Sequence, residues 1–498
     1  MAIGADQGSA GSSSCRMAAG RRGRAGIAVG APRAGRRPAR RSVLAAAALS
    51  SAVLLGGLGA GAPAAGSVSR GSAAAAVRGA RLWVGRVNGA ARGQAAAVAA
   101  SPDGSTVFVA GTVDAGAGSS DDVTVAYDAA TGARLWASRY GPDAATAVAV
   151  SPDGNTVFVT GGATVAYDAA TGAQLWASPF NGPLQFNYAL SIAVSPAGGT
   201  VFVTGYTHGE DADGDLIYWY ETAAYNAADG AQLWAATYQG GSFTRSVAVS
   251  PGGHAVYVTG VGGFGSSHGD AVTVAYDAAD GAQLWVQALN HPGRRSAAAS
   301  AVAVSPGGRT VYVAGVTGGA TRADYFTVAY KAATGTQRWT RFYAGPASGA
   351  SATAVAAGPG GRAVYVTGTS AGVTSGRDYA TIAYNAADGA RRWASRYNGP
   401  ANRGDFAYAV AVSPGGRSVY VTGASFAGAS TGNDFATVAY NAATGARLWT
   451  RRYNGPGNGG DQATSVAVSP AGGTVFVAGP SLGRAGQGLG YATIAYKG

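Results

Sequence analysis

The chain has 498 residues, of which 81 are Gly, 12% are charged and 47% are hydrophobic, and Ala and Val supply most of the hydrophobic share. This composition can bury a large core but is unlike that of a helical protein. The formal net charge of +12 is concentrated at the start, because residues 1–64 hold nine Arg and one Asp. Residues 65–498 carry 27 basic and 23 acidic side chains, a surplus too small for a nucleic-acid-binding footprint.

The beginning of the chain has the layout of an export signal. Residues 36–66 combine a basic segment, an apolar stretch from Val43 to about Ala60 and a small-residue cleavage site at 62–64. We therefore expect residues 1–64 to be a signal peptide and the protein to be secreted or otherwise extracytoplasmic.

Several details of this leader stay open. Arg40 and Arg41 precede Ser, Val and Leu, which resembles the twin-arginine export motif, so ordinary secretion and twin-arginine export both fit. An uncleaved membrane anchor is a third alternative. Met17 is an alternative start, and residues 65–78 are expected to be a linker. The single cysteine, Cys15, precedes the apolar stretch, so the mature chain has no disulfide, Cys-ligated metal or thiol nucleophile.

Four short apolar phrases recur in a fixed order from residue 79 onward. Examples are TAVAV at 146–150, TVFVTG at 156–161, ATVAYDAATG at 163–172 and AQLW at 173–176. Each alternates with a period of two and is rich in Val, Tyr or other strand-forming residues, which predicts a β-strand. Four strands per repeat, with 40 to 58 residues between successive repeat Trp residues, predict a series of four-stranded sheets.

Tight turns separate these strands. Between the first and second strands every repeat has Pro and, two residues later, Gly, as at Pro102 and Gly104. Pro presets φ for the turn and Gly accepts the left-handed conformation after it. The turn between the third and fourth strands ends in Gly for the same reason, as at Gly132.

The series of repeats begins and ends in the middle of a repeat. The third-strand Tyr occurs at Tyr127, Tyr167, Tyr225, Tyr276, Tyr330, Tyr384, Tyr440 and Tyr496. The fourth-strand Trp occurs at Trp83, Trp136, Trp176, Trp234, Trp285, Trp339, Trp393 and Trp449. The first Trp has no Tyr before it and the last Tyr has no Trp after it. We therefore predict an all-β, eight-bladed β-propeller over residues 79–498, closed by pairing strand 79–87 with the three C-terminal strands.

A repeated motif resembles one found in a known family. Ala126, Asp128, Gly132 and Trp136 stand at positions 1, 3, 7 and 11 of a pattern similar to the tryptophan-docking motif of quinoprotein (pyrroloquinoline quinone, PQQ) propellers. The spacing recurs six more times, and in that family the motif fastens blade to blade. The hairpins also resemble those of secreted bacterial propellers of the YVTN type. The resemblance implies an eight-bladed fold.

The same resemblance implies an active site that this chain matches poorly. Quinoprotein dehydrogenases hold the quinone between a Trp and a disulfide of adjacent cysteines, with calcium bound by Glu, Asn and Asp. Here the mature chain has no Cys, and Glu210 and Glu221 are its only Glu residues. We therefore expect the scaffold without PQQ. A PQQ-dependent oxidoreductase remains the first alternative, and a hydrolase or lactonase assembled from loops remains the second.

One acidic loop stands out. Asp211, Asp213 and Asp215 alternate around Gly214, which resembles the oxygen-rich loops that bind calcium. These three Asp residues are the candidate metal ligands, and calcium is the one candidate cofactor. The spacing matches no full EF-hand, so a solvated acidic loop is the alternative.

The strand after this loop departs from the repeat. Tyr218, Trp219 and Tyr220 replace its usual residues, which indicates a binding patch or a local extension of the strand. Blade two lacks its loop between the second and third strands, because FVTGGATVAY runs straight through.

Differences among the repeats suggest where a ligand binds. The connections that vary in length emerge on one face of a propeller, whereas the constant hairpins emerge on the other. We expect a secreted, non-catalytic binding or scaffold module that holds an extracellular protein or a cell-wall glycan on the variable-loop face. We also expect a monomer with no nucleic-acid partner and no membrane association beyond the export signal. Outer-membrane assembly scaffolds with a similar ring offer an analogy for such a role.

Overall fold

The computed structural model describes residues 77–88, 93–116, 119–141, 144–180, 186–210, 216–263, 269–289, 296–319, 322–484 and 488–498. The chain divides into two compact units, Met1–Ala46 and Ala47–Gly498, and all described residues belong to the second. The expected signal peptide and most of the expected linker lie outside the described residues. In the described part of the chain, no helix has the length and apolar character needed to cross a membrane.

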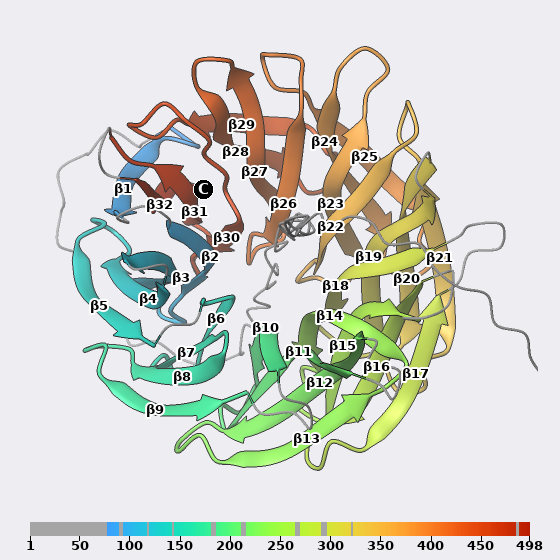
Figure 1. Cartoon of the computed structure of the whole chain (residues 1–498). Coiled ribbons are helices and arrows are strands. Elements are labelled where there is room, and N and C mark those ends of the chain that lie inside the picture. Colours follow the sequence, from blue (N-terminus) through green and yellow to red (C-terminus); the bar gives the residue numbers. More distant parts are fainter. Residues whose placement is uncertain are drawn as a thin grey trace, which may run out of the picture. The chain divides into compact units, whose positions relative to one another are not determined.

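Eight antiparallel sheets of four strands follow one another around a ring, as the repeats predict (Figure 1). Each sheet is one blade. Blade one comprises β2 (Gly93–Ala100), β3 (Thr106–Gly116), β4 (Ser119–Asp128) and β5 (Arg134–Tyr140), and blade two comprises β6 (Ala147–Val150), β7 (Thr156–Thr160), β8 (Ala163–Asp168) and β9 (Gln174–Pro179). Blade three comprises β10 (Phe186–Val194), β11 (Thr200–Glu210), β12 (Leu216–Asn226) and β13 (Gln232–Tyr238), and blade four comprises β14 (Gly241–Val249), β15 (Ala255–Gly262), β16 (Asp270–Asp277) and β17 (Gln283–Leu289).

Blades five to eight repeat the pattern, with β1 completing the last. Blade five comprises β18 (Ala297–Val304), β19 (Thr310–Gly319), β20 (Arg322–Lys331) and β21 (Gln337–Tyr343), and blade six comprises β22 (Ala350–Ala357), β23 (Ala363–Ala371), β24 (Arg377–Asn385) and β25 (Arg391–Tyr397). Blade seven comprises β26 (Asp405–Val412), β27 (Ser418–Gly428), β28 (Gly432–Asn441) and β29 (Arg447–Tyr453), and blade eight comprises β30 (Ser465–Val468), β31 (Thr474–Leu482), β32 (Leu489–Lys497) and β1 (Arg81–Val87).

The ring closes by pairing its two ends. The eighth sheet has the order β1-β32-β31-β30, and Trp83 of β1 lies opposite Ala495 of β32 (Figure 1, blue beside red). Two further backbone hydrogen bonds extend the pairing, from Gly79 N to Lys497 O and from Lys497 N to Ala80 O. The predicted closure is confirmed, and it leaves no unpaired seam in the last blade.

The repeated Trp joins each blade to the next. Among the described residues, the indole nitrogens of seven of these Trp side chains donate a hydrogen bond to a carbonyl oxygen of the following blade, at 2.8 to 3.2 Å. The ring of Trp83 also packs against the turn that contains Gly132, where a Cβ would lie 2.5 Å from the indole. Gly132 has a φ of +74°, so both the backbone conformation and the close approach require glycine. The structural role expected for the Trp motif is confirmed.

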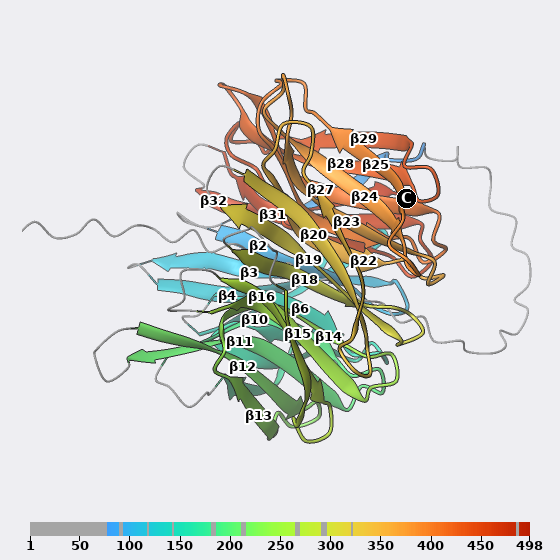
Figure 2. The same ribbon diagram turned by 90° about the vertical axis from the view of Figure 1, so that its right-hand side faces the viewer.

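The two ends of the strands form two different surfaces. The turns between the first and second strands and between the third and fourth strands, such as residues 151–156 and 168–173, make what we call the hairpin face. The other ends make the variable face. There β7 and β8 are joined through Gly161 and Gly162 alone, as expected, whereas β11 and β12 are 11 residues long. Figure 2 shows β3, β4, β11 and β12 projecting on the left of the view.

Candidate functional site

Five ring side chains gather on the variable face at the junction of the third and fourth blades. This aromatic cluster comprises Tyr188 of β10, Tyr206 and His208 of β11, Tyr218 of β12 and Phe243 of β14. All five side chains are half-buried, so each keeps part of its ring in solvent. Strand register brings them together, because Tyr188 lies opposite Tyr206 and His208 lies opposite Tyr218.

The rings of the cluster contact one another closely. Phe243 lies 4.7 Å from Tyr218 and 5.0 Å from Tyr206 between ring centroids, the latter edge to face. His208 lies 5.4 Å from Tyr218. Burial, with a smaller contribution from nearby Tyr218, raises the pKa of the Tyr206 hydroxyl above its ordinary value, so this hydroxyl stays protonated at neutral pH. The cluster is a partly exposed aromatic surface that includes three Tyr hydroxyl groups.

No other blade repeats the central ring of this surface. Tyr206 is the seventh residue counted from the start of β11, the second strand of its blade. The equivalent position of each other blade is counted in the same way from the start of its second strand. The other blades place small or aliphatic residues there: Thr112, Gly162, Val261, Val316, Thr369, Ala424 and Pro480. The other blades form their second strand without an aromatic ring at this position, so the fold itself does not require the cluster.

The extended strand β12 has two faces with different surroundings. Tyr218 and Tyr220 point toward the fourth blade. Tyr220 is fully buried there, and its ring lies 5.8 Å from that of Tyr238 in the neighbouring strand β13 of its own blade. Gly241 allows this packing, because a Cβ there would lie 2.3 Å from the Tyr220 ring. Trp219 is half-buried and points the opposite way. The extension of the strand is confirmed. The binding patch stays a prediction, in which only Tyr218 can take part at the surface because Tyr220 is core.

A carboxyl group is buried on the side of β12 that faces the second blade. Glu221 alternates with Ala223 and Tyr225, which pack against that blade, and only 1% of Glu221 is exposed. Its Oε2 accepts a 2.8 Å hydrogen bond from the Thr237 hydroxyl, while Oε1 has no hydrogen-bond partner among the described residues. Burial raises the pKa of this carboxyl to about 7, against a smaller lowering by the Thr237 hydrogen bond.

Every other blade has an apolar residue at the position of Glu221. These are Val123, Ala163, Val272, Phe326, Ala380, Ala436 and Ala492. Sequence reasoning noted Glu221 only as one of two Glu residues. Comparison of the eight repeats, four residues before each repeated Tyr, was the signal that could have identified it.

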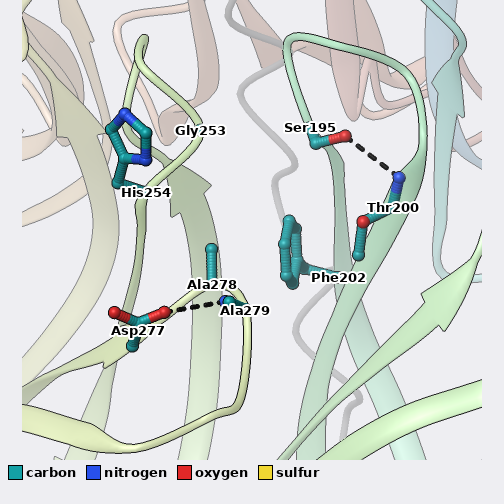
Figure 3. A pocket seen from close by; sticks show the side chains of 8 residues that line it. All are labelled: Ser195, Thr200, Phe202, Gly253, His254, Asp277, Ala278 and Ala279. Atoms are coloured by element: carbon teal, nitrogen blue, oxygen red, sulfur yellow. Dashed lines mark hydrogen bonds between the residues drawn. The ribbon is translucent and has the colours of Figure 1, made fainter.

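A cavity of about 360 Å³ opens on the hairpin face between the third and fourth blades (Figure 3). Its lining comprises Ser195, Thr200, Phe202, Gly253, His254, Asp277, Ala278 and Ala279. The Ser195 hydroxyl accepts a bond from Thr200 N, and Asp277 accepts one from Ala279 N, so both are engaged in their own turns.

The cavity lies where a contact made by three other blades is missing, as it also is in blades one, two and eight, which have Phe108, Phe158 and Phe476 at the same position. At the position of Phe202, the fourth, fifth and sixth blades have Tyr257, Tyr312 and Tyr365. Each of these hydroxyls donates to a carbonyl oxygen of the next blade, at 3.2 to 3.5 Å. Phe202 has no hydroxyl to fill this space, and the exposed His254 stands where Arg309 stands in the fifth blade. We attribute the cavity to packing rather than to a ligand site.

The candidate calcium ligands Asp211, Asp213 and Asp215 lie outside the described residues. Their role stays a prediction. Within the described ranges, no three His, Cys, Asp or Glu side chains come together in a group able to hold a metal ion.

The ring of eight sheets and its repeated Trp contacts define a PQQ-like β-propeller. The model of the PQQ_2 family, described as "Outer membrane protein assembly factor BamB", matches residues 119–223 and 220–486. The chain therefore belongs to this family. In the comparison with curated proteins, nothing matches.

Solved structures are similar to the chain in fold. The chain is 14% identical to Sqt1 of Chaetomium thermophilum bound to the N-terminus of the ribosomal protein L10, with a TM-score of 0.56 over 83% of this chain and 98% of that one. It is 14% identical to BamB from Moraxella catarrhalis (TM-score 0.47; 84% and 99% covered) and 15% identical to hydrazine synthase of Kuenenia stuttgartiensis (TM-score 0.46; 69% and 94% covered). At these identities the Sqt1 match supports the propeller fold alone.

The residues present do not fit a quinone site of the quinoprotein type. Cys15 is the only cysteine in the sequence, so no pair of adjacent cysteines exists. Glu221 is buried against Thr237 inside the third blade, and the repeated Trp residues are engaged between blades. We derive no redox step for this chain.

Proposed function

We propose that this protein is a non-catalytic binding module that holds a protein ligand on the aromatic cluster of its variable face. The observation that carries the proposal is the cluster itself, five half-buried rings from four strands at a junction where the other repeats have no counterpart to Tyr206. Tyr combines a large rigid ring with a hydrogen-bonding hydroxyl, which suits the central contacts of a protein interface.

A polypeptide ligand is favoured over a cell-wall glycan by two arguments. The three Tyr side chains of the cluster can provide both apolar and polar contacts, and Tyr is enriched at protein interfaces. In addition, Sqt1, which has a similar ring, is described as bound to the N-terminus of a ribosomal protein. The proposal includes an extracytoplasmic location, which the export-like composition of residues 1–64 supports.

The test uses two probes on the full chain: peptides selected from a displayed random library, and soluble cell-wall oligosaccharides. We expect selected peptides to bind the wild type and to bind Tyr218→Ala and Phe243→Ala at least about tenfold more weakly, as loss of a hot-spot ring does. Phe342→Ala is the matched control, because Phe342 is 42% exposed on the outer strand β21, away from the cluster.

Each outcome of this binding experiment distinguishes between ligand sites or ligand classes. Peptides that bind all variants equally would place the ligand elsewhere. Binding of oligosaccharides alone, with the same sensitivity to Tyr218→Ala, would keep the site but change the ligand class to glycan. Thermal unfolding of each variant separates loss of the site from loss of the fold.

A further inference from the structure

Charge is divided between the two halves of the ring. Residues 93–289, which form blades one to four, contain 17 acidic side chains, three Arg and no Lys. Residues 77–92 and 290–498, which form blades five to eight, contain 23 basic and six acidic side chains. The near-neutral sum over the propeller conceals this division.

The division is sharpest on the hairpin face. We call the Asp side chains at the hairpins of blades one to four the acidic half. In blades one and two these are Asp103, Asp128, Asp153 and Asp168. In blades three and four they are Asp229, Asp277 and Asp280. Arg134 is the one basic side chain described at the equivalent hairpin positions of these four blades.

The basic half occupies the corresponding positions in the other four blades. In blades five and six its members are Arg309, Lys331, Arg338, Arg362, Arg391 and Arg392. In blades seven and eight they are Arg417, Arg447, Arg78, Arg81 and Lys497. All eleven are exposed, and Asp388 is the one acidic side chain described at these positions.

The fold does not require this arrangement of charge. The Asp128 carboxylate accepts a hydrogen bond from Ala130 N in its turn, but the neutral amides of Asn385 and Asn441 accept the equivalent bond in blades six and seven. The ion pairs formed between described residues, such as Arg396 with Asp378, join the third and fourth strands near the variable face. They leave the side chains of both halves available for a partner.

We propose that the hairpin face binds the hairpin face of a second copy of this chain. If one copy is turned over about the diameter that separates the two halves, its basic half covers the acidic half of the other, and the reverse holds at the same time. Such a contact is two-fold symmetric and closed, which is the commonest arrangement of homodimers. This proposal replaces the expectation of a monomer and is independent of the ligand site on the variable face.

The symmetry assigns each blade a partner blade. Blade three covers blade six, which places Asp229 over the surface of Arg362 and Arg392. Blade four covers blade five, which places Asp280 over the surface of Arg309. By the same operation blade one covers blade eight and blade two covers blade seven, so an acidic blade meets a basic one at all four positions.

The exposed leucines of the outer strands add apolar area beside this face. Leu135 and Leu82 lie in the paired blades one and eight, and Leu175 and Leu448 lie in the paired blades two and seven. Their exposed fractions are 40 to 52%. Complementary charge steers the encounter and fixes its orientation, and it is weakened by salt. A polyanion bound to the basic half would leave the acidic half without a role, so a second copy accounts for more of the surface.

The experiment measures the mass of the full chain by sedimentation equilibrium at about 50 mM and about 500 mM NaCl, where the Debye length falls from roughly 14 to 4 Å. We expect a dimer at the lower salt whose dissociation constant rises at least about tenfold at the higher. A wild-type chain that stays monomeric at micromolar concentrations in both salts would overturn the proposal.

Two charge-reversal variants test the assigned pairing. Arg309→Asp with Arg392→Asp places acidic side chains opposite Asp280 and Asp229, and Asp229→Arg with Asp280→Arg places basic side chains opposite Arg392 and Arg309. Each variant alone is expected to be monomeric with an unchanged unfolding midpoint, because like charges then face each other. An equal mixture of the two is expected to dimerise again, since opposite charges then meet at all of the exchanged positions.

Controls separate this contact from other causes. Arg377→Asp with Arg403→Asp reverses two exposed charges on the variable face and is expected to leave the dimer intact. A dimer that survives both hairpin-face variants, or variants that fail to restore each other, would show that another surface is used. Retention of inorganic polyphosphate by a monomeric wild type, lost in Arg309→Asp with Arg392→Asp, would instead assign the basic half to a polyanion.

Discussion

The indole nitrogen of Trp83 donates a 3.0 Å hydrogen bond to the carbonyl oxygen of Ala129, across the point where the eighth blade meets the first. The same bond joins Trp136 to Ala169 between the first and second blades, which are continuous in sequence, at 2.9 Å. The junction between the eighth and first blades is therefore built like a junction inside the ring.

This equivalence predicts equal penalties at the two junctions. Trp83→Phe and Trp136→Phe each remove the donor and leave a buried carbonyl group without it, because Phe476 and Phe108 have no hydroxyl that could replace it. Each variant is therefore expected to lower the free energy of unfolding by about 1–3 kcal/mol. Chemical denaturation of the two variants checks this. A much smaller loss for Trp83→Phe would mean that the ends of the chain are not fastened in solution.

Glu221 makes stability depend on pH. Its carboxyl has a pKa of about 7 in the folded chain, raised from an ordinary value of 4.5, so the folded state binds more protons than the unfolded state between these values. Stability from this group is full below about pH 4.5 and is lost as pH rises through 7, by about 3 kcal/mol at most. We expect Glu221→Gln to remove this part of the pH dependence.

The measurement is the free energy of unfolding at several pH values between 4.5 and 8. Glu210→Gln is the control, because Glu210 is exposed and is the only other Glu. Identical pH profiles for wild type and Glu221→Gln would contradict the burial of an ionisable carboxyl at this position.

The missing hydroxyl at Phe202 predicts a stabilising substitution. Phe202→Tyr should extend a hydroxyl toward the carbonyl oxygen of Ala278, as Tyr365 does toward Ala442 at 3.2 Å, and should raise the free energy of unfolding by about 0.5–1.5 kcal/mol. Tyr365→Phe should lower it by a similar amount. If the two variants shift thermal unfolding in the same direction, the cavity has another cause.

Gly132 is predicted to tolerate no side chain. Gly132→Ala adds a Cβ against the Trp83 indole and at a φ of +74°, and we expect a loss of at least about 2 kcal/mol. Gly473→Ala is the comparison, because a Cβ there meets no atom within 4 Å and φ is not positive. Thermal denaturation of both variants should separate the two sites, and equal midpoints would argue against the close approach of the turn to Trp83.

Calcium binding by Asp211, Asp213 and Asp215 stays a prediction with a direct test. Any ion that binds only the folded state raises its unfolding midpoint. We expect calcium to raise the midpoint of the wild type and to leave that of the triple Asn variant unchanged. No shift in the wild type would favour a solvated acidic loop.

The fold was predictable because its main features are local and repeated. Strand alternation, the Pro and Gly turns and the unmatched Trp83 and Tyr496 are all visible in the sequence, and together they indicate eight closed blades. The aromatic cluster was predictable only at Tyr218, because Tyr188, Tyr206 and Phe243 join it from three other strands and no sequence spacing links them.

The burial of Glu221 and the division of charge between the two halves of the ring were not predicted from the sequence, for a different reason. Both are differences between equivalent positions of the repeats, whereas the fold is specified by the residues that the repeats share. Summing charge over residues 65–498 likewise averaged an acidic half with a basic half. Glu221 and the divided charge become apparent only in the folded ring, which shows which blades are neighbours and which lie opposite one another.

The place of β1 in the eighth blade sets an order of events in biosynthesis. β1 is among the first propeller segments to be made, but its partner β32 is the last. At the roughly 5–20 residues per second at which chains are synthesised, β1 has no partner for tens of seconds. During that interval the nascent chain presents an unpaired strand at its front, so a chaperone or another growing chain has time to reach it before the final residues complete the circle.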